Sequence, residues 1–242
     1  MAKKARSIQR REASLSRESI VEATIEILDS SGERGLTFRA LSERLVTGPG
    51  AIYGHIEHKG DLLTAACDAI IARTTNALPG GATPDEAIRA LALGMFDAID
   101  AHPWLGSALI RAPGQLPMVR IFERIGQPVR ALGVAPNAQW AVVSALLSYI
   151  IGVSVQNAAN AHLAQEMGAE RDSLLADVSA MWSTLDAHAY PFTRSVAAQL
   201  PVHDDRADFL AGIDLILRGI GTMPRAPARI SPPKKRRTVA AR

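Results

Sequence analysis

The sequence predicts an all-α protein with a small N-terminal part and a larger C-terminal part. Hydrophobic residues make up 48% of the 242 residues but aromatic residues only 5%, and an Ala-rich, aromatic-poor composition favours packed helices over sheets. Apolar residues recur at intervals of three and four along most of the chain, which is the helical spacing. No segment shows the alternation expected of a strand, and the length allows a sizeable core.

Capping residues place the first helices. Ser16 is a good N-cap, and we expect the first helix to run from there to Gly32. Thr37 caps a second helix. Gly48-Pro49 opens a third of about two turns, ending near Ile56, because proline fits the first helical turn.

The remaining helices follow from the same signals. A fourth helix is expected from Asp61 to Ala77, after which Leu78–Gly81 breaks the chain and separates the two parts. The further helices expected, in chain order, are 83–101, 104–110, 116–132, 136–167, a helical turn or more within 174–185 of a polar region, and 204–220.

Charge is concentrated at the two ends of the chain. Residues 1–17 hold six basic residues and one acid, and residues 222–242 hold seven basic residues and no acid. These ends sum to +12, so the overall charge of +3 leaves −9 for the residues between them. Basic ends suit phosphate contacts, and they equally suit solvated, disordered tails.

Nothing in the sequence indicates catalysis or a cofactor. Cys67 is the only cysteine, which excludes a disulfide within the chain, and we expect it to be a buried structural residue. No His, Asp or Glu cluster has metal-ligand spacing, and no nucleophile–base pair or glycine-rich phosphate loop is present. The basic N-terminus has no apolar signal core, so we expect a cytoplasmic protein.

The helix expected at 136–167 is unusually apolar. It contains no charged residue before Glu166, but its apolar run is short for a membrane span and has amide flanks rather than basic ones. Ser144, Ser148 and Gly152 form a ridge of small residues on which another helix can pack closely. With Ile213 and Leu217 of the last helix they predict a dimer interface; the alternative is a helix at the centre of a single-chain core.

The segment Thr37–Lys59 has the layout of a helix-turn-helix that reads DNA. Its second helix is short and polar, with Tyr53 and His55 as its conspicuous side chains, and small residues there allow close approach to a major groove. An ordinary helical hairpin with these residues on its surface is the alternative. The predicted DNA-binding residues are Thr37, Arg39, Pro49, Gly50, Ala51, Tyr53, Gly54, His55 and Lys59.

The N-terminal part contains the run LSRESIVEATIEILDSSGERGLTFRALSERL and, after it, GPGAIYGHIEHKGDLLTAA. These two segments resemble the N-terminal domain of the tetracycline repressor (TetR) family. The C-terminal part resembles the tetracycline-repressor-like ligand domain, through HPWL at 102–105, LLSYIIGVSVQ at 146–156 and FLAGIDLILRGI at 209–220. The resemblance implies DNA contacts by Tyr53, His55, Lys59 and Thr37. It also implies a dimer built by the long helix and the last helix.

Two positions depart from the family pattern. The family commonly has glycine in the turn where Val46 stands, and a β-branched residue disfavours positive φ, so we expect the turn to shift toward Gly48. The histidines with which tetracycline repressors hold the magnesium-bound drug align with Ala108 and Thr75. This argues against tetracycline as the ligand.

The predicted function is a ligand-responsive transcriptional regulator, a repressor released from its operator by a small, mostly apolar effector. The alternative is an architectural DNA-binding protein that uses its basic ends and has no effector. We assign residues 1–14 to a basic arm, 15–62 to the DNA-binding domain, 63–222 to the ligand-binding and dimerisation domain and 223–242 to a basic Pro-rich tail. The candidate ligand-binding residues are His102, Trp104, Arg111, Phe122 and Tyr149.

Overall fold

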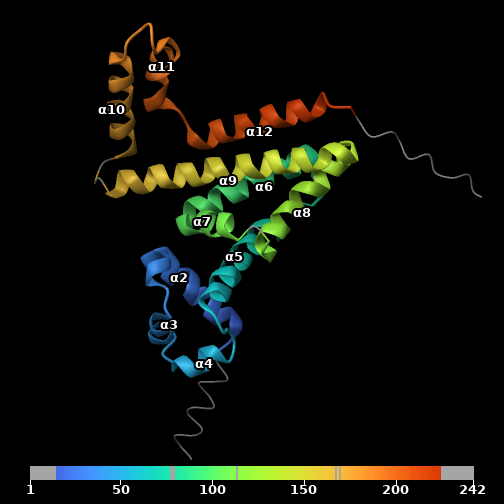
Figure 1. The fold of residues 1–242 in the computed structure, drawn as a ribbon, viewed down its shortest axis with the longest axis vertical. Coiled ribbons are helices and arrows are strands. Elements are labelled where there is room, and N and C mark those ends of the chain that lie inside the picture. The colour runs from blue at the N-terminus through green and yellow to red at the C-terminus, as the bar shows by residue number, and fades with distance from the viewer. Residues whose placement is uncertain (1–14, 77–79, 113, 167, 169, 225–242) are drawn as a thin grey trace, which may run out of the picture.

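The computed structural model describes residues 15–76, 80–112, 114–166, 168 and 170–224. These residues form helices and no β-strand (Figure 1), so the predicted all-α class is confirmed. The predicted arm at 1–14 and residues 225–242 of the predicted tail lie outside the described residues.

Three helices form the N-terminal unit at one end of the elongated molecule (Figure 1). They are α2 (Arg17–Gly35), α3 (Phe38–Arg44) and α4 (Pro49–Tyr53). Ser16 caps α2 through a reciprocal pair of hydrogen bonds with Ser19. Helical geometry breaks at Gly32, where φ is 61°, and one further turn follows this kink. Helix α4 has five residues rather than the two turns predicted.

Helix α5 (Lys59–Asn76) joins the N-terminal unit to the rest of the chain. It packs against α2 on one side and against α6, α7 and α8 on the other. Leu62, Ala66 and Ile71 are fully buried along it. The predicted domain boundary between residues 62 and 63 therefore falls inside a continuous helix that packs on both parts of the chain.

The helical body consists of α6 (Pro84–Ala101), α7 (Pro103–Arg111), α8 (Leu116–Ala131), α9 (Pro136–Glu166) and α12 (Asp205–Gly221). Thr83 and Glu86 form a capping box at the start of α6, at the position that the sequence predicts. Helix α9 crosses the molecule, with α12 beside it (Figure 1). Its contacts with α6, α7, α8 and α12 make it the central element of the body.

Between Pro136 and Ala164, α9 is long and apolar enough to span a membrane by length and composition, and no other helix of the described residues passes that test. Most of its exposed residues are small or polar, including Ala145, Ser148, Gly152 and Gln156, while Trp140 and Leu163 are its exposed large apolar residues. A lipid-facing surface would instead favour large apolar side chains. This composition fits packing against protein.

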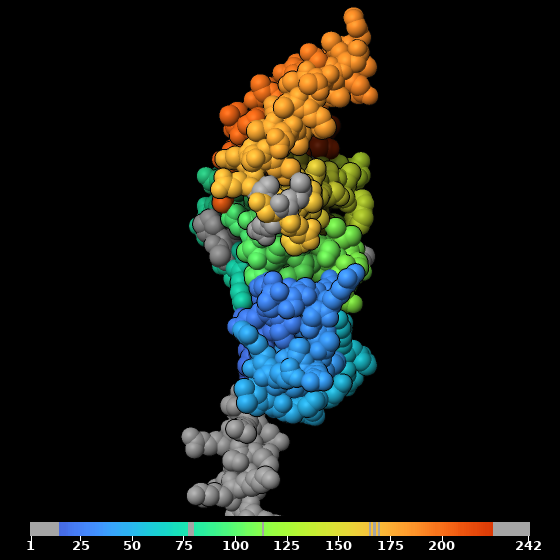
Figure 2. All heavy atoms as spheres, turned by 90° about the vertical axis from the view of Figure 1, so that its left-hand side faces the viewer, coloured from blue at the N-terminus to red at the C-terminus, as the bar shows by residue number. Residues whose placement is uncertain are grey.

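A helical projection stands away from the body at the end of α9 (Figures 1 and 2). It contains α10 (Arg171–Thr184), α11 (Pro191–Val196) and the 3₁₀ helix η1 (Ala197–Val202), and we call residues 170–202 the projection. These elements pack mainly on one another. The sequence predicted only a helical turn or more here, because no apolar face is buried in α10 or α11.

Candidate nucleic-acid interface and its surroundings

The first helix of the predicted helix-turn-helix is α3, which begins at Thr37. The Thr37 hydroxyl oxygen accepts the Ala40 backbone N–H at 3.0 Å, as an N-cap does. The Phe38 and Tyr53 rings stack with centroids 4.4 Å apart and planes 19° from parallel. The stack links the start of α3 to the end of α4 and holds the Tyr53 ring, which is 51% exposed, in one orientation.

Apolar residues under α4 fix its position. Ile52 is 0% and Ile56 3% exposed, which confirms the prediction that both face inward. Leu41 of α3 is also fully buried. Because full burial of such a side chain contributes about 1.5–3 kcal/mol, these contacts hold a helix that is too short to be stable on its own.

The turn between α3 and α4 does not shift toward Gly48, so that prediction is wrong. Val46 itself has a φ of 51° and is the one non-glycine residue with positive φ in the described ranges. The Val46 N–H donates to Glu43 O at 3.3 Å and the Thr47 N–H to Ser42 O at 3.0 Å, the pair of bonds of a Schellman motif. These bonds and the buried helices around the turn hold valine in a conformation that usually requires glycine, while Gly48 (φ −88°) serves as the N-cap of α4.

The outer surface of α4 and its following turn is largely free of bulky side chains. Pro49, Gly50, Gly54 and His55 are exposed, and Ala51 is half-buried. No heavy atom lies within 4 Å of a Cβ built on Gly50, so the surface is open. Backbone at this surface can approach a ligand more closely than on a helix with long side chains.

The cationic residues near this surface are engaged with neighbours in the protein. Arg39 Nε lies 2.9 Å from Glu43 Oε1, and the hydrogen bond and charge of Glu43 raise the pKa of Arg39. Lys59 Nζ donates to the backbone oxygen of Glu33 at 2.6 Å. Arg39 is 89% exposed at its side chain, so its pairing with Glu43 is easily exchanged for another anion.

Three of the candidate ligand-binding residues contact acidic residues of α2. Trp104 Nε1 donates to Asp29 Oδ1 at 2.7 Å, and His102 Nδ1 lies 2.8 Å from the same oxygen. Arg111 pairs with Glu33. All three join α7 to α2, through partners more than 70 positions away that a sequence alone does not reveal.

Phe122 and Tyr149 each pack against another aromatic ring. The Phe122 ring lies against Trp140, with centroids 5.3 Å apart. Tyr149 stacks on Phe209 and donates its hydroxyl to the Phe209 backbone oxygen at 3.1 Å. Burial, and then the charge of Asp208, raise the pKa of Tyr149. Beyond the aromatic residue types, nothing in the sequence indicates these contacts.

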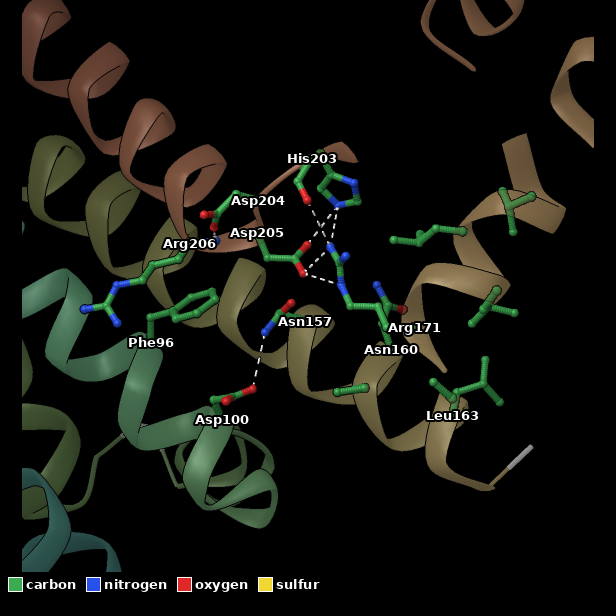
Figure 3. A pocket seen from close by; sticks show the side chains of 15 residues that line it. Phe96, Asp100, Asn157, Asn160, Leu163, Arg171, His203, Asp204, Asp205 and Arg206 are labelled. Carbon is green, nitrogen blue, oxygen red and sulfur yellow. Dashed lines mark hydrogen bonds and ion pairs between the residues drawn. The ribbon is translucent and has the colours of Figure 1, made fainter. Parts of the chain in front are cut away.

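A cavity of about 770 Å³ lies between α6, α9, the projection and the start of α12 (Figure 3). Its lining includes apolar side chains, such as Phe96 and Leu163, and a polar cluster. In that cluster Arg171 lies 2.6 Å from Asp205 Oδ2, and His203 lies 3.0 Å from Asp205 Oδ1. None of the five candidate ligand-binding residues lines this cavity.

The predicted dimer residues divide into two groups. On α9, Ser148 and Gly152 are exposed and Ser144 is half-buried. On α12, Ile213 is 0% and Leu217 5% exposed, because both face the core of their own chain. The prediction that these two α12 residues form an interface is therefore wrong.

The described residues contain no group of three or more His, Cys, Asp or Glu side chains placed to hold a metal ion. Cys67 is 3% exposed, and burial raises the pKa of its thiol to about 12. Because the thiolate is the reactive form, this cysteine is a structural residue, as predicted.

No protein-family model matches the chain. The solved structure of SCO7222, a TetR transcriptional regulator from Streptomyces coelicolor, is 51% identical to it. The similarity covers 86% of this chain and 98% of SCO7222, with a TM-score of 0.78. The chain belongs to the TetR family. It is a transcriptional regulator with a helix-turn-helix, not an enzyme.

Other TetR-like proteins are more distant. The transcriptional repressor DrrR1 of Streptomyces coeruleorubidus is 25% identical over 217 residues, which cover 85% of this chain and 77% of DrrR1. A regulator of Saccharopolyspora erythraea is 28% identical over 140 residues, 57% of this chain and 59% of its own length. The fold of ActR from S. coelicolor, solved with actinorhodin, matches with a TM-score of 0.71 at 21% identity over 86% of this chain and 96% of ActR.

Proposed function

We propose that this TetR-family chain is a homodimeric repressor that leaves its operator when a small molecule binds. The observation that carries the proposal is the surface of α4 and its following turn, which exposes Gly50 and Gly54 together with the side chains of Tyr53 and His55. Buried Ile52 and the Phe38 ring hold this surface rigidly. A regulator of this kind works in the cytoplasm, where the DNA is.

On DNA, α4 enters the major groove and its neighbours contact the phosphates. The small residues permit close approach, while the Tyr53 hydroxyl and the His55 ring supply hydrogen bonds. Thr37 stands at the N-terminus of α3, and Lys59 and Arg39 exchange their protein partners for phosphate oxygens. Since the residues between the charged ends are acidic overall, affinity depends on these few residues rather than on a broad basic face.

The exposed faces of α9 and α12 are the proposed dimer interface. Ala145, Ser148 and Gly152 form a stripe of small residues on α9, and Leu215 of α12 is 64% exposed. Small side chains allow helices from two chains to pack closely, as in a four-helix interface. The dimer places two reading helices on half-sites about one helical turn of DNA apart.

The cavity beside the projection is the proposed effector site. Its volume of about 770 Å³ suits a drug-sized ligand. The apolar lining residues, including Phe96 and Leu163, fit a largely apolar molecule, and the polar cluster of Arg171 and His203 fits a polar group on it. The complex of ActR with actinorhodin supports a small-molecule effector for this fold.

The decisive experiment uses a DNA duplex that the wild-type protein selects from a randomised pool. His55→Ala and Tyr53→Phe should each weaken binding about tenfold or more, because each removes a polar contact to DNA; Tyr53→Phe keeps the ring that stacks on Phe38. Tyr190→Ala is the matched control, since Tyr190 is equally exposed but lies in the projection. Gel shifts measure affinity, and sedimentation measures the dimer.

Unchanged affinity in both variants would disprove the interface. Lys59→Ala and Tyr53→Ala should abolish operator binding and keep the dimer. Because they also remove the contacts with Glu33 and Phe38, they complement the two milder changes. Deletion of residues 1–12 and 225–242 tests the alternative of an architectural DNA-binding protein. Loss of DNA binding while the helix-turn-helix stays folded would favour binding through the basic ends.

A further inference from the structure

Helix α7 lies between the N-terminal unit and the long helix α9 (Figure 1). At its start, one oxygen of Asp29 on α2 receives two hydrogen bonds, from Trp104 at 2.7 Å and His102 at 2.8 Å. A carboxylate only accepts, so His102 donates through Nδ1–H. Trp104 is 7% exposed, and its indole N–H therefore depends on this acceptor.

The opposite side of α7 meets α9 at Gly106. A Cβ at this position would overlap the Val155 Cγ2 atom of α9 and come within 3.5 Å of Ile99. Only glycine allows the two helices to lie this close. Since a packed contact of this kind leaves no room to slide, α7 and α9 move together.

Two further bonds hold the end of α2, beyond its kink at Gly32. Arg111 of α7 pairs with the Glu33 side chain, and Lys59 of α5 bonds the Glu33 backbone oxygen. Asp29 lies before the kink and Glu33 after it. The chain continues from Gly35 directly to Thr37 and α3, so a displacement of this end of α2 displaces the helix-turn-helix.

We propose that Asp29 is a positioning residue that, through Trp104 and His102, fixes the angle between the helix-turn-helix and α7, while Gly106 fixes α7 to α9. This inference rests on the proposed function, because its consequence is the spacing of two reading helices in a dimer. Directional hydrogen bonds set an angle more sharply than an apolar contact does. Changing the Asp29 cluster therefore changes operator affinity without changing any DNA-contacting residue.

The test measures the distance between the two helix-turn-helix units in the dimer. A spin label is attached at Glu57→Cys, an exposed position, in a Cys67→Ala background. Trp104→Phe removes the indole N–H but keeps a ring, and Asp29→Ala removes the acceptor. Both should broaden and shift the distance distribution, and unlabelled versions should bind the selected duplex about tenfold more weakly, with dimer affinity unchanged.

Three comparisons make the result specific. Asp29→Asn keeps an oxygen that accepts the Trp104 N–H and should recover most of the affinity. Gly106→Ala should shift the distance, whereas Gly126→Ala, where a Cβ meets nothing within 4 Å, should not. Circular dichroism and thermal unfolding show whether each variant is folded, so lost affinity through lost structure is recognised.

The inference would be overturned if the Asp29→Ala and Trp104→Phe dimers are folded, keep the wild-type distance between the two units and bind the duplex within twofold of wild type. The proposed function would not be affected by that result. Unfolding of both Trp104→Phe and Asp29→Asn would also overturn it, since the cluster would then serve folding rather than position. A wild-type chain that is monomeric or selects no duplex would overturn the proposed function, and this inference with it.

Discussion

The N-terminal unit, which holds the helix-turn-helix, and the projection are both small helical units at opposite ends of the molecule (Figure 1), but their apolar residues are used differently. In the N-terminal unit, Ile20 of α2, Leu41 of α3 and Ile52 of α4 are all 0% exposed. In the projection, Ala197 is the one buried residue of those described, while Phe192 is 75% exposed. The first unit is complete within one chain, and the second carries apolar surface that the chain does not cover.

The largest expected effect on stability is in the N-terminal unit. Ile52→Ala should lower the free energy of unfolding by about 2–5 kcal/mol, because it removes a fully buried side chain and leaves a cavity under α4. Urea unfolding followed by circular dichroism measures the change. A loss below 1 kcal/mol would show that the helix-turn-helix is as loosely packed as the projection, contrary to the comparison.

The next effect uses pH to compare buried and exposed thiols. Burial holds the Cys67 pKa at about 12, whereas the unfolded thiol ionises near pH 8.5. Above that pH the unfolded state loses a proton that the folded state keeps. Stability should therefore fall as pH rises from about 9 toward 12, by up to about 1.4 kcal/mol per pH unit.

Urea unfolding at pH 7, 9 and 10 measures this slope, and Cys67→Ala should reduce it. A cysteine placed in the projection by Met181→Cys, in the Cys67→Ala background, should be alkylated rapidly at pH 8, whereas native Cys67 should be alkylated slowly. Equal alkylation rates at the two positions would contradict the difference in burial.

A smaller effect is expected at the turn. Val46→Gly should stabilise the protein by about 1 kcal/mol, because glycine adopts positive φ without the steric cost that valine bears. Val46→Ala, which keeps a Cβ, should give less. Thermal unfolding measures both changes, and destabilisation by Val46→Gly would show that the exposed valine side chain makes a stabilising contact.

The smallest effect is expected in the projection. Phe192→Ala should change the unfolding free energy by no more than about 0.5 kcal/mol in dilute solution, because the ring is largely exposed in a single chain. The measurement is repeated at increasing protein concentration. A destabilisation that grows with concentration would show that a second chain covers Phe192, and the contrast between the two units would then hold only for the monomer.

Features set by residues close together in the chain could be predicted from the sequence, and features set by distant residues could not. Local signals placed the start of α6, because the Thr83 capping box lies within one turn, and the inward residues Ile52 and Ile56 follow from helical spacing. The Val46 turn was missed, because bonds and packing around it override the preference of valine. The roles of His102 and Trp104 were missed because they depend on Asp29, which lies close only after folding.

The sharing of α5 between the two domains has a consequence for building regulators with new DNA specificity. A chimaera joined at residue 62 would divide a helix and separate Leu62 from Ala66 and Ile71, which are buried together along it. Joining after Asn76 would keep the helix whole, but the exchanged unit would then need to match α6, α7 and α8 of its new host. The fit of α5 against α6, α7 and α8, more than the reading helix itself, therefore limits which family members can exchange their DNA-binding domains.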